Sequence, residues 1–413
     1  MSVSVNRERA PHDRTTVPQF PGWPHYDDDE VAAATAVLRS GRVNYWTGTE
    51  ARCFEREYAN AIGVRHAVAL ANGTVALEIA LAMLGIGPGD EVVTSPRTFI
   101  ASASCAVMRG ARPVFADVDR DSQNITAPSI ERVLSPRTRA IVVVHLAGWP
   151  CEMEPIMALA ASRNVAVIED CAQANGALYQ GRPVGSFGVF GAFSFCQDKI
   201  LSTGGEGGLL VTQDETLWSR AWSFKDHGKS FQAAHRNDHP PGFRWLHESF
   251  GTNGRMTEFQ AAIGRKQLAK LENWVARRRL NAQRLAEGLR EIDALRVPLP
   301  GSHIKHAYYK FYAFLDTARL KSTWTRDRII AEVTARGVPC FSGSCSEVYL
   351  ERAFEGSESR PAQRLPVARE LGETSLMFLV HPTLTVEHMD VTCSVVRDVI
   401  EEAIGEVRPR PCL

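Results

Sequence analysis

Helical and strand-like segments alternate along the first half of the chain, and this alternation constrains the fold more than any other feature. Residues 139–148, RAIVVVHLAG, form an uninterrupted apolar run that predicts a strand buried on both faces. Residues 165–174 predict the next strand and its exit loop, and a helical pattern at 153–164 separates the two. Strands joined in this way pair in parallel through right-handed crossovers. We therefore predict an α/β fold with a mostly parallel central sheet flanked by helices, in which ligands gather at the carboxyl ends of the strands.

A long helical pattern over residues 256–292 separates this α/β region from the remainder of the chain. A strand pattern at 308–316 and helical patterns at 325–337 and 387–404 follow it and predict a smaller α+β domain. The chain has 413 residues, which is too long for one ordinary core. The predicted parts are a polar, flexible N-terminal arm at 1–24, a large domain at 25–275 and a small C-terminal domain at 276–413.

The charge balance and the absence of long apolar runs limit the possible partners. Lysine plus arginine and aspartate plus glutamate both number 47, so the formal net charge is zero. Binding to nucleic acid requires a basic surplus, so we expect no nucleic-acid partner. No stretch has the length and apolarity of a signal peptide or a membrane span, which predicts a cytoplasmic protein without a membrane partner.

The cysteines and histidines give no metal-site pattern. The nine cysteines include no CxxC pair, and Cys340 and Cys345 have no histidine nearby, so we expect reduced thiols. His235 and His239 are four residues apart, a spacing that binds zinc on helices. Two prolines follow His239 directly, so this segment is predicted to be a flexible loop without a metal.

Polar residues follow several of the predicted strands. Asp170 ends the apolar run VAVIED and Gln173 follows it, while Ser194 and Lys199 lie at and after the later run GAFSF. Thr74 opens a helix, where free backbone N–H groups bind anions. Each feature alone has an ordinary explanation, namely a helix cap, a buried salt bridge or a solvated lysine. Together they suit pyridoxal phosphate, which needs donors for its phosphate, a carboxylate for its ring nitrogen and a primary amine for its aldehyde.

Four stretches carry a strong resemblance to a known family. From about residue 25 to the C-terminus, the chain resembles the DegT/DnrJ/EryC/StrS family of pyridoxal-phosphate-dependent sugar aminotransferases. The resemblance implies the aspartate-aminotransferase type of fold, also called the type I fold of pyridoxal-phosphate transferases. The stretches are ANGTVALEIAL at 71–81, VIEDCAQANGA at 167–177, FSFCQDKILSTGGEGG at 193–208 and GTNGRMTEFQAAIG at 251–264.

This resemblance implies a role for each candidate site residue. Lys199 would form the internal aldimine with pyridoxal phosphate and later carry the proton, and Asp170 would pair with the ring nitrogen. Gln173 would lie near the ring hydroxyl. The remaining matches are Gly73, Thr74 and Ser194 at the phosphate, Phe99 over the ring, and Asn253, donated to the phosphate by the second subunit of a homodimer with shared active sites.

The function implied is transfer of an amino group from glutamate or glutamine to a keto sugar, either nucleotide-activated or a cyclitol ketone. Such a step would belong to antibiotic or surface-polysaccharide biosynthesis. A dehydratase of the same fold is disfavoured, because those relatives replace the lysine at position 199 with histidine. A synthase of an aminobenzoate precursor and a non-catalytic regulatory homologue remain alternatives, although the latter is expected to have lost Lys199 or Asp170.

The sequence departs from the family pattern on the expected substrate side. Ala147 stands where relatives commonly carry an aromatic residue, and Cys-Gln-Asp at 196–198 precedes the lysine in place of the usual residues. His306 and Tyr308, together with residues 340–349, resemble acceptor-side segments, although buried packing explains the histidine and tyrosine equally well. The identity of the acceptor therefore stays open at this stage.

Overall fold

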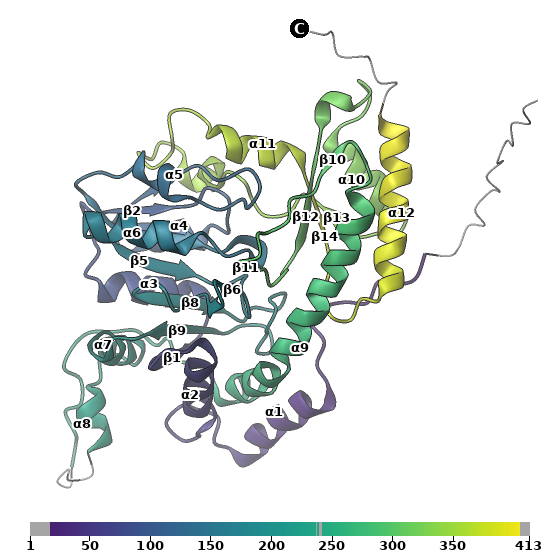
Figure 1. Cartoon of the computed structure of the whole chain (residues 1–413). Helices are drawn as coiled ribbons and strands as arrows, with labels where there is room; N and C mark the ends of the chain where they lie inside the picture. Colours follow the sequence, from purple (N-terminus) through teal and green to yellow (C-terminus); the bar gives the residue numbers. More distant parts are fainter. Residues whose placement is uncertain (1–16, 237, 239–241, 405–413) are drawn as a thin grey trace, which may run out of the picture.

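The computed structural model describes residues 17–236, 238 and 242–404, and its main element is a seven-stranded sheet in the order β1-β9-β8-β5-β4-β2-β3 (Figure 1). Neighbours among β3, β2, β4, β5 and β8 pair in parallel, whereas β9 runs antiparallel to both β8 and β1. The prediction of a mostly parallel sheet is confirmed. The strands are β1 (His66–Leu70), β2 (Glu91–Thr94), β3 (Arg112–Phe115), β4 (Thr138–Val144), β5 (Ala166–Asp170), β8 (Phe190–Ser194) and β9 (Gly208–Thr212).

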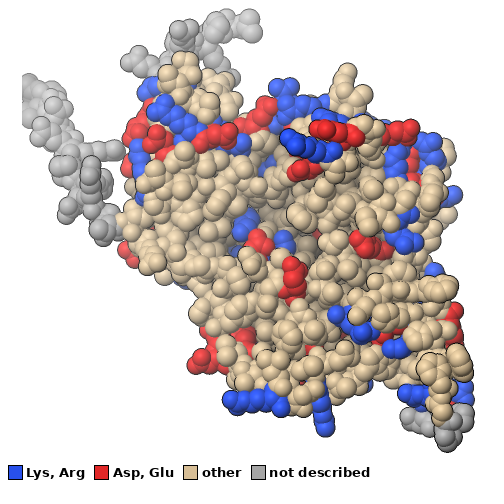
Figure 2. All heavy atoms as spheres, turned by 180° about the vertical axis from the view of Figure 1, so that it is seen from behind, with Lys and Arg blue, Asp and Glu red and all other residues tan. Residues whose placement is uncertain are grey.

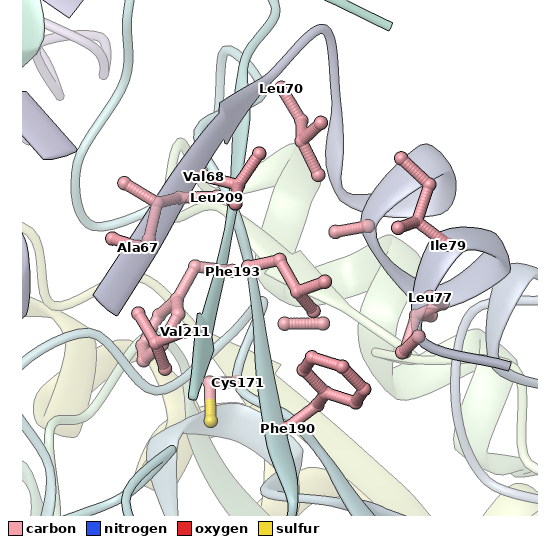
Figure 3. Close-up of a cluster of buried hydrophobic side chains, with 14 of the residues drawn as sticks. Ala67, Val68, Leu70, Leu77, Ile79, Cys171, Phe190, Phe193, Leu209 and Val211 are labelled. Atoms are coloured by element: carbon pink, nitrogen blue, oxygen red, sulfur yellow. The ribbon is translucent and has the colours of Figure 1, made fainter. Parts of the chain in front are cut away.

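Both faces of this sheet are covered by helices, as the uninterrupted apolar strands require. Successive side chains of a strand point to opposite faces, and Val142 of β4 belongs to one apolar cluster while Ile141 and Val143 belong to another. Figure 3 shows part of the first cluster, where Leu77 and Ile79 of a helix pack beside strand residues such as Phe190. The helices around the sheet are α2 (Glu50–Ile62), α3 (Gly73–Met83), α4 (Ala101–Met108), α5 (Ala127–Glu131), α6 (Met153–Arg163) and α7 (Glu215–Lys225).

A second, four-stranded antiparallel sheet forms the C-terminal part of the fold. Its order is β10-β12-β14-β13, and it packs with the last helices of the chain around a separate apolar cluster. Its elements are β10 (Leu295–Arg296), β12 (Phe311–Leu315), β13 (Cys340–Phe341), β14 (Ser375–Phe378), α10 (Arg326–Ala335), α11 (Pro366–Thr374) and α12 (Val386–Ala403). A small sheet of β11 (Ile304–Lys305), β6 (Leu178–Tyr179) and β7 (Arg182–Pro183) joins the two parts.

Helix α9 (Glu258–Leu289) links the two sheets as one uninterrupted helix of 32 residues, matching the predicted helical pattern (Figure 1). Its residues up to Val275 pack in the core of the large sheet, and from Ala282 onward they pack in the core of the small one. The proposed division at 275/276 therefore falls inside a helix, near the point where its core contacts change. The division remains a proposal.

The described part of the N-terminal segment, residues 17–24, packs against the body of the protein. The Phe20 ring contacts His388 of α12 at a centroid distance of 4.8 Å, and Trp23 contacts Trp274 at 5.1 Å. Trp23 also donates its indole N–H to the backbone carbonyl of Lys199 over 2.7 Å. The rest of the proposed arm, residues 1–16, lies outside the described residues. Within the described residues, no helix combines the length and apolarity needed to cross a lipid bilayer.

Candidate active site

A cavity of about 880 Å³ lies at the carboxyl ends of β5 and β8, where a parallel sheet is expected to bind its ligand. The starts of α3 and α4 and the loop after β8 form one side of its wall. The other side comes from residues before and within β12 and from the segment 343–351. Figure 2 shows the middle of one face hollowed, with acidic and basic side chains gathered there amid mostly uncharged surface.

Lys199 lies in this wall, in the loop that follows β8. Its side chain is 16% exposed, and its Nζ lies 3.8 Å from Oδ1 of Asp198 and 4.9 Å from the centre of the Tyr309 ring. The hydrogen bond from Trp23 holds the backbone of the lysine. The Lys199 side chain therefore lies largely buried in the cavity wall and is not a solvated surface group.

Asp170 ends β5 and is 7% exposed. Its Oδ2 accepts a hydrogen bond from the Ser102 hydroxyl over 2.7 Å, and its Oδ1 accepts one from the N–H of Ala172 over 3.1 Å. Ser102 is in turn hydrogen-bonded to Thr98 over 2.8 Å. Among the ion pairs of the described residues, none involves Asp170, so its charge faces the cavity without a protein cation.

A cradle of small residues and donors lies at the start of α3. The side chain of Asn72 caps the helix by accepting the N–H of Val75, and the first helical turn leaves further N–H groups unpaired within the helix. Gly73 packs so closely on Ser194 that an added Cβ would lie 2.8 Å from the Ser194 Cβ. Gly73, Thr74 and Ser194 all line the cavity, which makes this corner suited to an anion.

Gln173 and Phe99 line the same cavity. The side-chain oxygen of Gln173 accepts the N–H of Ala147 over 2.8 Å, which leaves its amide NH₂ as a donor. Ala147 has a φ of 56°, in the left-handed region that non-glycine residues rarely adopt, so this hydrogen bond fixes an unusual backbone conformation. The Phe99 side chain is 67% exposed, so a large apolar ring is available to a ligand.

The C-terminal wall of the cavity contains residues that the sequence did not single out. Tyr309 donates its hydroxyl hydrogen bond to Asp198, and Lys310 lies 3.9 Å from the same carboxylate. Burial raises the pKa of Asp198, but Lys199, Tyr309 and Lys310 together outweigh it and hold that pKa below the ordinary value of 3.8. Burial and the nearby Asp198 charge raise the pKa of Tyr309 well above its usual range, so its hydroxyl stays protonated.

The model of the DegT/DnrJ/EryC1/StrS aminotransferase family matches residues 24–397. The chain belongs to this family. Two curated relatives agree with the assignment. The spore coat polysaccharide biosynthesis protein SpsC of Bacillus subtilis is 33% identical over 91% of this chain and 95% of its own length. A UDP-N-acetyl-3-dehydro-α-D-glucosamine 3-aminotransferase of Acidithiobacillus ferrooxidans is 37% identical over 85% of this chain and 88% of its own.

Solved structures of the family share the fold. An aminotransferase from Psychrobacter cryohalolentis is 54% identical, with a TM-score of 0.91, covering 94% of this chain and all of its own. DesV of S. venezuelae, solved with a ketimine intermediate, is 32% identical with a TM-score of 0.80, covering 89% of this chain and 93% of its own. A 3-amino-5-hydroxybenzoic acid synthase is 29% identical with a TM-score of 0.83, covering 94% of this chain and 100% of its own. The predicted fold type is confirmed.

Members of the DegT/DnrJ/EryC1/StrS family use pyridoxal phosphate, and the residues of this cavity fit that cofactor. A nearly buried carboxylate without a cation suits a protonated ring nitrogen, and the cradle at Gly73 suits a phosphate. Lys199 supplies a primary amine in the same wall. Of the eight residues predicted from the sequence, seven line this cavity.

The eighth, Asn253, lies outside the cavity wall and is exposed. It forms an isolated bridge with Asp226 at the base of the segment that carries α8 (Phe231–His235). Figure 1 shows α8 projecting away from the sheet. An exposed position is what a residue donated to a neighbouring subunit requires, so its role in a shared site stays a prediction of the family resemblance.

His306 and Tyr308 do not line the cavity. Their rings stack face to face at 3.8 Å, and burial together with the Arg279 charge lowers the pKa of His306 to about 3. They therefore serve packing, while the neighbouring Tyr309 and Lys310 face the cavity. The other expected acceptor-side segment does contribute, through residues 343–345 and Val348.

A buried group of possible metal ligands, His145, Glu169 and Cys171, lies beneath the site. The Glu169 carboxylate already accepts the N–H groups of Gly185, Phe187 and Gly188 and contacts His145 Nε2 at 3.0 Å. These donors leave no open coordination position on the carboxylate, so the group is structural. Of the earlier histidine pair, His235 ends α8, and His239 lies outside the described residues.

Proposed function

We propose that this protein is a pyridoxal-phosphate-dependent aminotransferase that moves an amino group from glutamate or glutamine to a keto sugar. The observation that carries the proposal is the pair formed by Asp170 and Lys199 across one cavity. Asp170 is nearly buried and forms no ion pair with any described residue, and such a charge is costly unless a ligand supplies the counter-charge. A ring nitrogen that carries a proton supplies it.

The side chains around the proposed cofactor site have separate roles in the reaction. Pyridoxal phosphate, when bound, supplies an electron-withdrawing ring that acidifies the C–H bond at the amine carbon. Asp170 would stabilise the protonated ring nitrogen of the cofactor, and Ser102 holds the carboxylate in place. With the cofactor bound, the Lys199 amine would act as the general base that removes the proton from the amine carbon of the donor, and in the reverse half-reaction its protonated form would act as the general acid that protonates the corresponding carbon of the acceptor.

The acceptor class rests on the relatives. One of them is named as acting on a UDP-linked 3-keto sugar, and another belongs to polysaccharide biosynthesis. A synthase of an aminobenzoate precursor is the second candidate, because the 3-amino-5-hydroxybenzoic acid synthase shares this fold at 29% identity. A panel of keto sugar nucleotides, cyclitol ketones and aminobenzoate precursors, read by mass spectrometry with each donor, separates the two.

We also propose that the active form is a homodimer. The segment between α8 and Asn253 exposes three large apolar side chains, Phe243 at 76%, Trp245 at 87% and Phe250 at 99%. Exposed apolar groups gathered on one segment favour contact with another protein surface. A second copy that covers this segment would also bring Asn253 toward a partner cavity. Light scattering should give twice the chain mass of 45.5 kDa, and Asn253→Ala should weaken cofactor retention. A cytoplasmic location is proposed from the sequence alone.

Borohydride reduction of the cofactor-loaded protein, followed by peptide mapping, tests the central assignment. Reduction should fix the cofactor to Lys199, and Lys199→Ala should lack both the adduct and the yellow colour. Lys310 lies close by and provides an internal control, since the same map reports whether it reacts instead. An unmodified Lys199 after incubation with excess cofactor would refute the proposal.

A further inference from the structure

An amino-acid donor carries an α-carboxylate next to the amine that reacts, and a cation in the cavity wall would bind it strongly. Of the described residues that line the cavity, only Lys199 and Lys310 are basic. Lys199 is committed to the cofactor under the proposed function. Apart from Lys310, the charged side chains near Lys199 in the wall are all acidic and would repel a carboxylate. They are Asp198, Glu206 and Glu351. Lys310 is therefore the one described cation of the wall that is left for this task.

We infer that Lys310 binds the α-carboxylate of the amino donor. The inference rests on the proposed aminotransferase function and names a substrate-binding residue for it. Lys310 comes directly before β12, on the side of the cavity opposite the strands that hold the cofactor residues. Its side chain is 18% exposed, so the ammonium group is largely shielded from water yet open to the cavity.

The position of Lys310 relative to Lys199 suits a group that lies two bonds from the reacting nitrogen. Both lysines flank the carboxylate of Asp198, at 3.8 Å for Lys199 and 3.9 Å for Lys310. Both ammonium groups also lie over the ring of Tyr309, at 4.9 and 4.7 Å from its centre. An ammonium group has three donor hydrogens, so Lys310 can keep its contact with Asp198 and still bind a substrate carboxylate.

The charge around Lys310 favours an added anion. Arg278 of α9 is fully buried behind this wall, and its guanidinium donates to the carbonyls of Tyr308 and Tyr309 without an acidic partner among its hydrogen bonds. Among the carboxylates of the described residues, Asp198 is the one that lies within 4 Å of both Lys199 and Lys310, and its charge also acts on Arg278. Burial, Arg278 and Lys199 lower the pKa of Lys310 to about 8, although Asp198 opposes this shift. A bound carboxylate would relieve this excess of positive charge.

The pH dependence follows from the same groups. The charged or titratable side chains that face Lys310 are Asp198, Lys199, Tyr309, Arg278 and, beyond β14, His381. The donor binds the protonated form of Lys310, so affinity for the donor should be full below the lysine pKa and fall as the pH rises above about 8. Replacing Lys310 with a neutral side chain should remove this fall.

The experiment titrates the cofactor-loaded enzyme with two probes and follows the cofactor absorbance. L-2-Methylglutamate carries the amine and the α-carboxylate but has no proton to lose at that carbon, so it reports binding without turnover. 4-Aminobutyrate lacks the α-carboxylate. Lys310→Met should weaken 2-methylglutamate binding about 10- to 100-fold, the range for loss of a hydrogen bond to a charged group, and leave 4-aminobutyrate binding unchanged.

Two further variants control this result. Lys305→Met removes an exposed lysine on β11 outside the cavity wall and should change neither probe. Lys310→Arg keeps the charge and should retain most of the affinity, which separates a carboxylate contact from a general structural defect. The acceptor half-reaction, started from enzyme loaded with pyridoxamine phosphate, involves no α-carboxylate on the acceptor and should be slowed less in Lys310→Met than 2-methylglutamate binding is weakened.

Equal loss for both probes, unchanged 2-methylglutamate binding, or a loss confined to the acceptor half-reaction would each overturn the assignment of Lys310. A different result would refute the proposed function itself. If the wild-type enzyme bound the cofactor but reacted with neither glutamate nor glutamine, the aminotransferase proposal would fail, and the Lys310 inference would fail with it.

Discussion

A buried carboxylate lies at each end of the parallel strands of the seven-stranded sheet, and the two have opposite surroundings. At the amino end of β2, Glu91 is 2% exposed and has three donors: Arg112 at 2.5 Å, Arg137 at 2.7 Å and the Ser135 hydroxyl at 2.6 Å. At the carboxyl end of β5, Asp170 is 7% exposed, and within the described part of the chain it accepts hydrogen bonds from one hydroxyl and one backbone N–H. One end compensates its charge fully within the protein, and the other leaves the charge to a ligand.

Glu169, the neighbour of Asp170 on β5, sharpens this contrast. It points to the other face of the sheet, is fully buried, and accepts three backbone N–H groups while it contacts His145. Adjacent carboxylates on one strand therefore differ in the way that structural and functional groups are expected to differ. A buried charge without a protein counter-charge is the better marker of a site than burial itself.

The largest effect is expected for Asp170→Asn. The substitution keeps the size of the side chain and an oxygen acceptor for Ser102 but removes the charge that faces the cavity. Loss of one partner of a buried charge pair costs about 3–5 kcal/mol, so aminotransferase kcat/KM should fall by roughly 10²- to 10⁴-fold. Steady-state kinetics with a saturating donor measure the fall, and a near-wild-type rate would contradict the ring-nitrogen pairing.

A smaller effect is expected for Ser102→Ala, which removes the donor to Asp170 without touching the charge. A hydrogen bond to a charged group contributes about 1.5–3 kcal/mol, so kcat/KM should fall by about 10- to 100-fold. Thr98→Val is the matched control, because Thr98 contacts the Ser102 hydroxyl and not the carboxylate, and it should cost less. If Thr98→Val lowered kcat/KM more than Ser102→Ala, the direct hydrogen bond from Ser102 to Asp170 would not explain the effect.

The smallest effect on activity, none, is expected for Glu91→Gln at the opposite end of the sheet. Burial raises the pKa of Glu91, but Ser135, Arg112 and Arg137 outweigh it and lower the pKa from 4.5 to about 2. A carboxyl with a lowered pKa stabilises the fold above its ordinary pKa and loses this contribution as the pH falls from 4.5 toward 2.

The variant should therefore lower the melting temperature by a few degrees at pH 7, corresponding to about 1–3 kcal/mol, with unchanged kcat/KM. The difference from wild type should shrink between pH 4.5 and pH 2. Melting curves measured by circular dichroism over this range give the comparison. A difference independent of pH would mean that packing, and not the ionised carboxylate, explains the loss.

Much of the fold and of the cofactor side could be predicted from the sequence, because both depend on short segments. The apolar runs of β4 and β5 predicted strands covered on both faces, and Asp170, Ser194 and Lys199 follow such runs within a few residues. Ser102 was missed, although it lies three residues after Phe99, in the first turn of α4. Its role depends on a contact 68 residues away along the chain.

The C-terminal wall could not be predicted in this way. The sequence pointed to His306 and Tyr308 there, but their rings stack on each other away from the cavity, while Tyr309 and Lys310 face it. Residues 306–310 precede β12, so no strand alternation fixes the direction of their side chains, and the tertiary structure alone shows which of them face the cavity.

The sequence by itself determined the strand and helix pattern and the set of groups able to hold a phosphate, a ring nitrogen and an aldehyde. These properties depend on side-chain chemistry and on spacing within a few residues. Only the tertiary structure decided which buried charges remain uncompensated and that Lys310 shares Asp198 with Lys199, because both depend on distances between segments far apart in the chain.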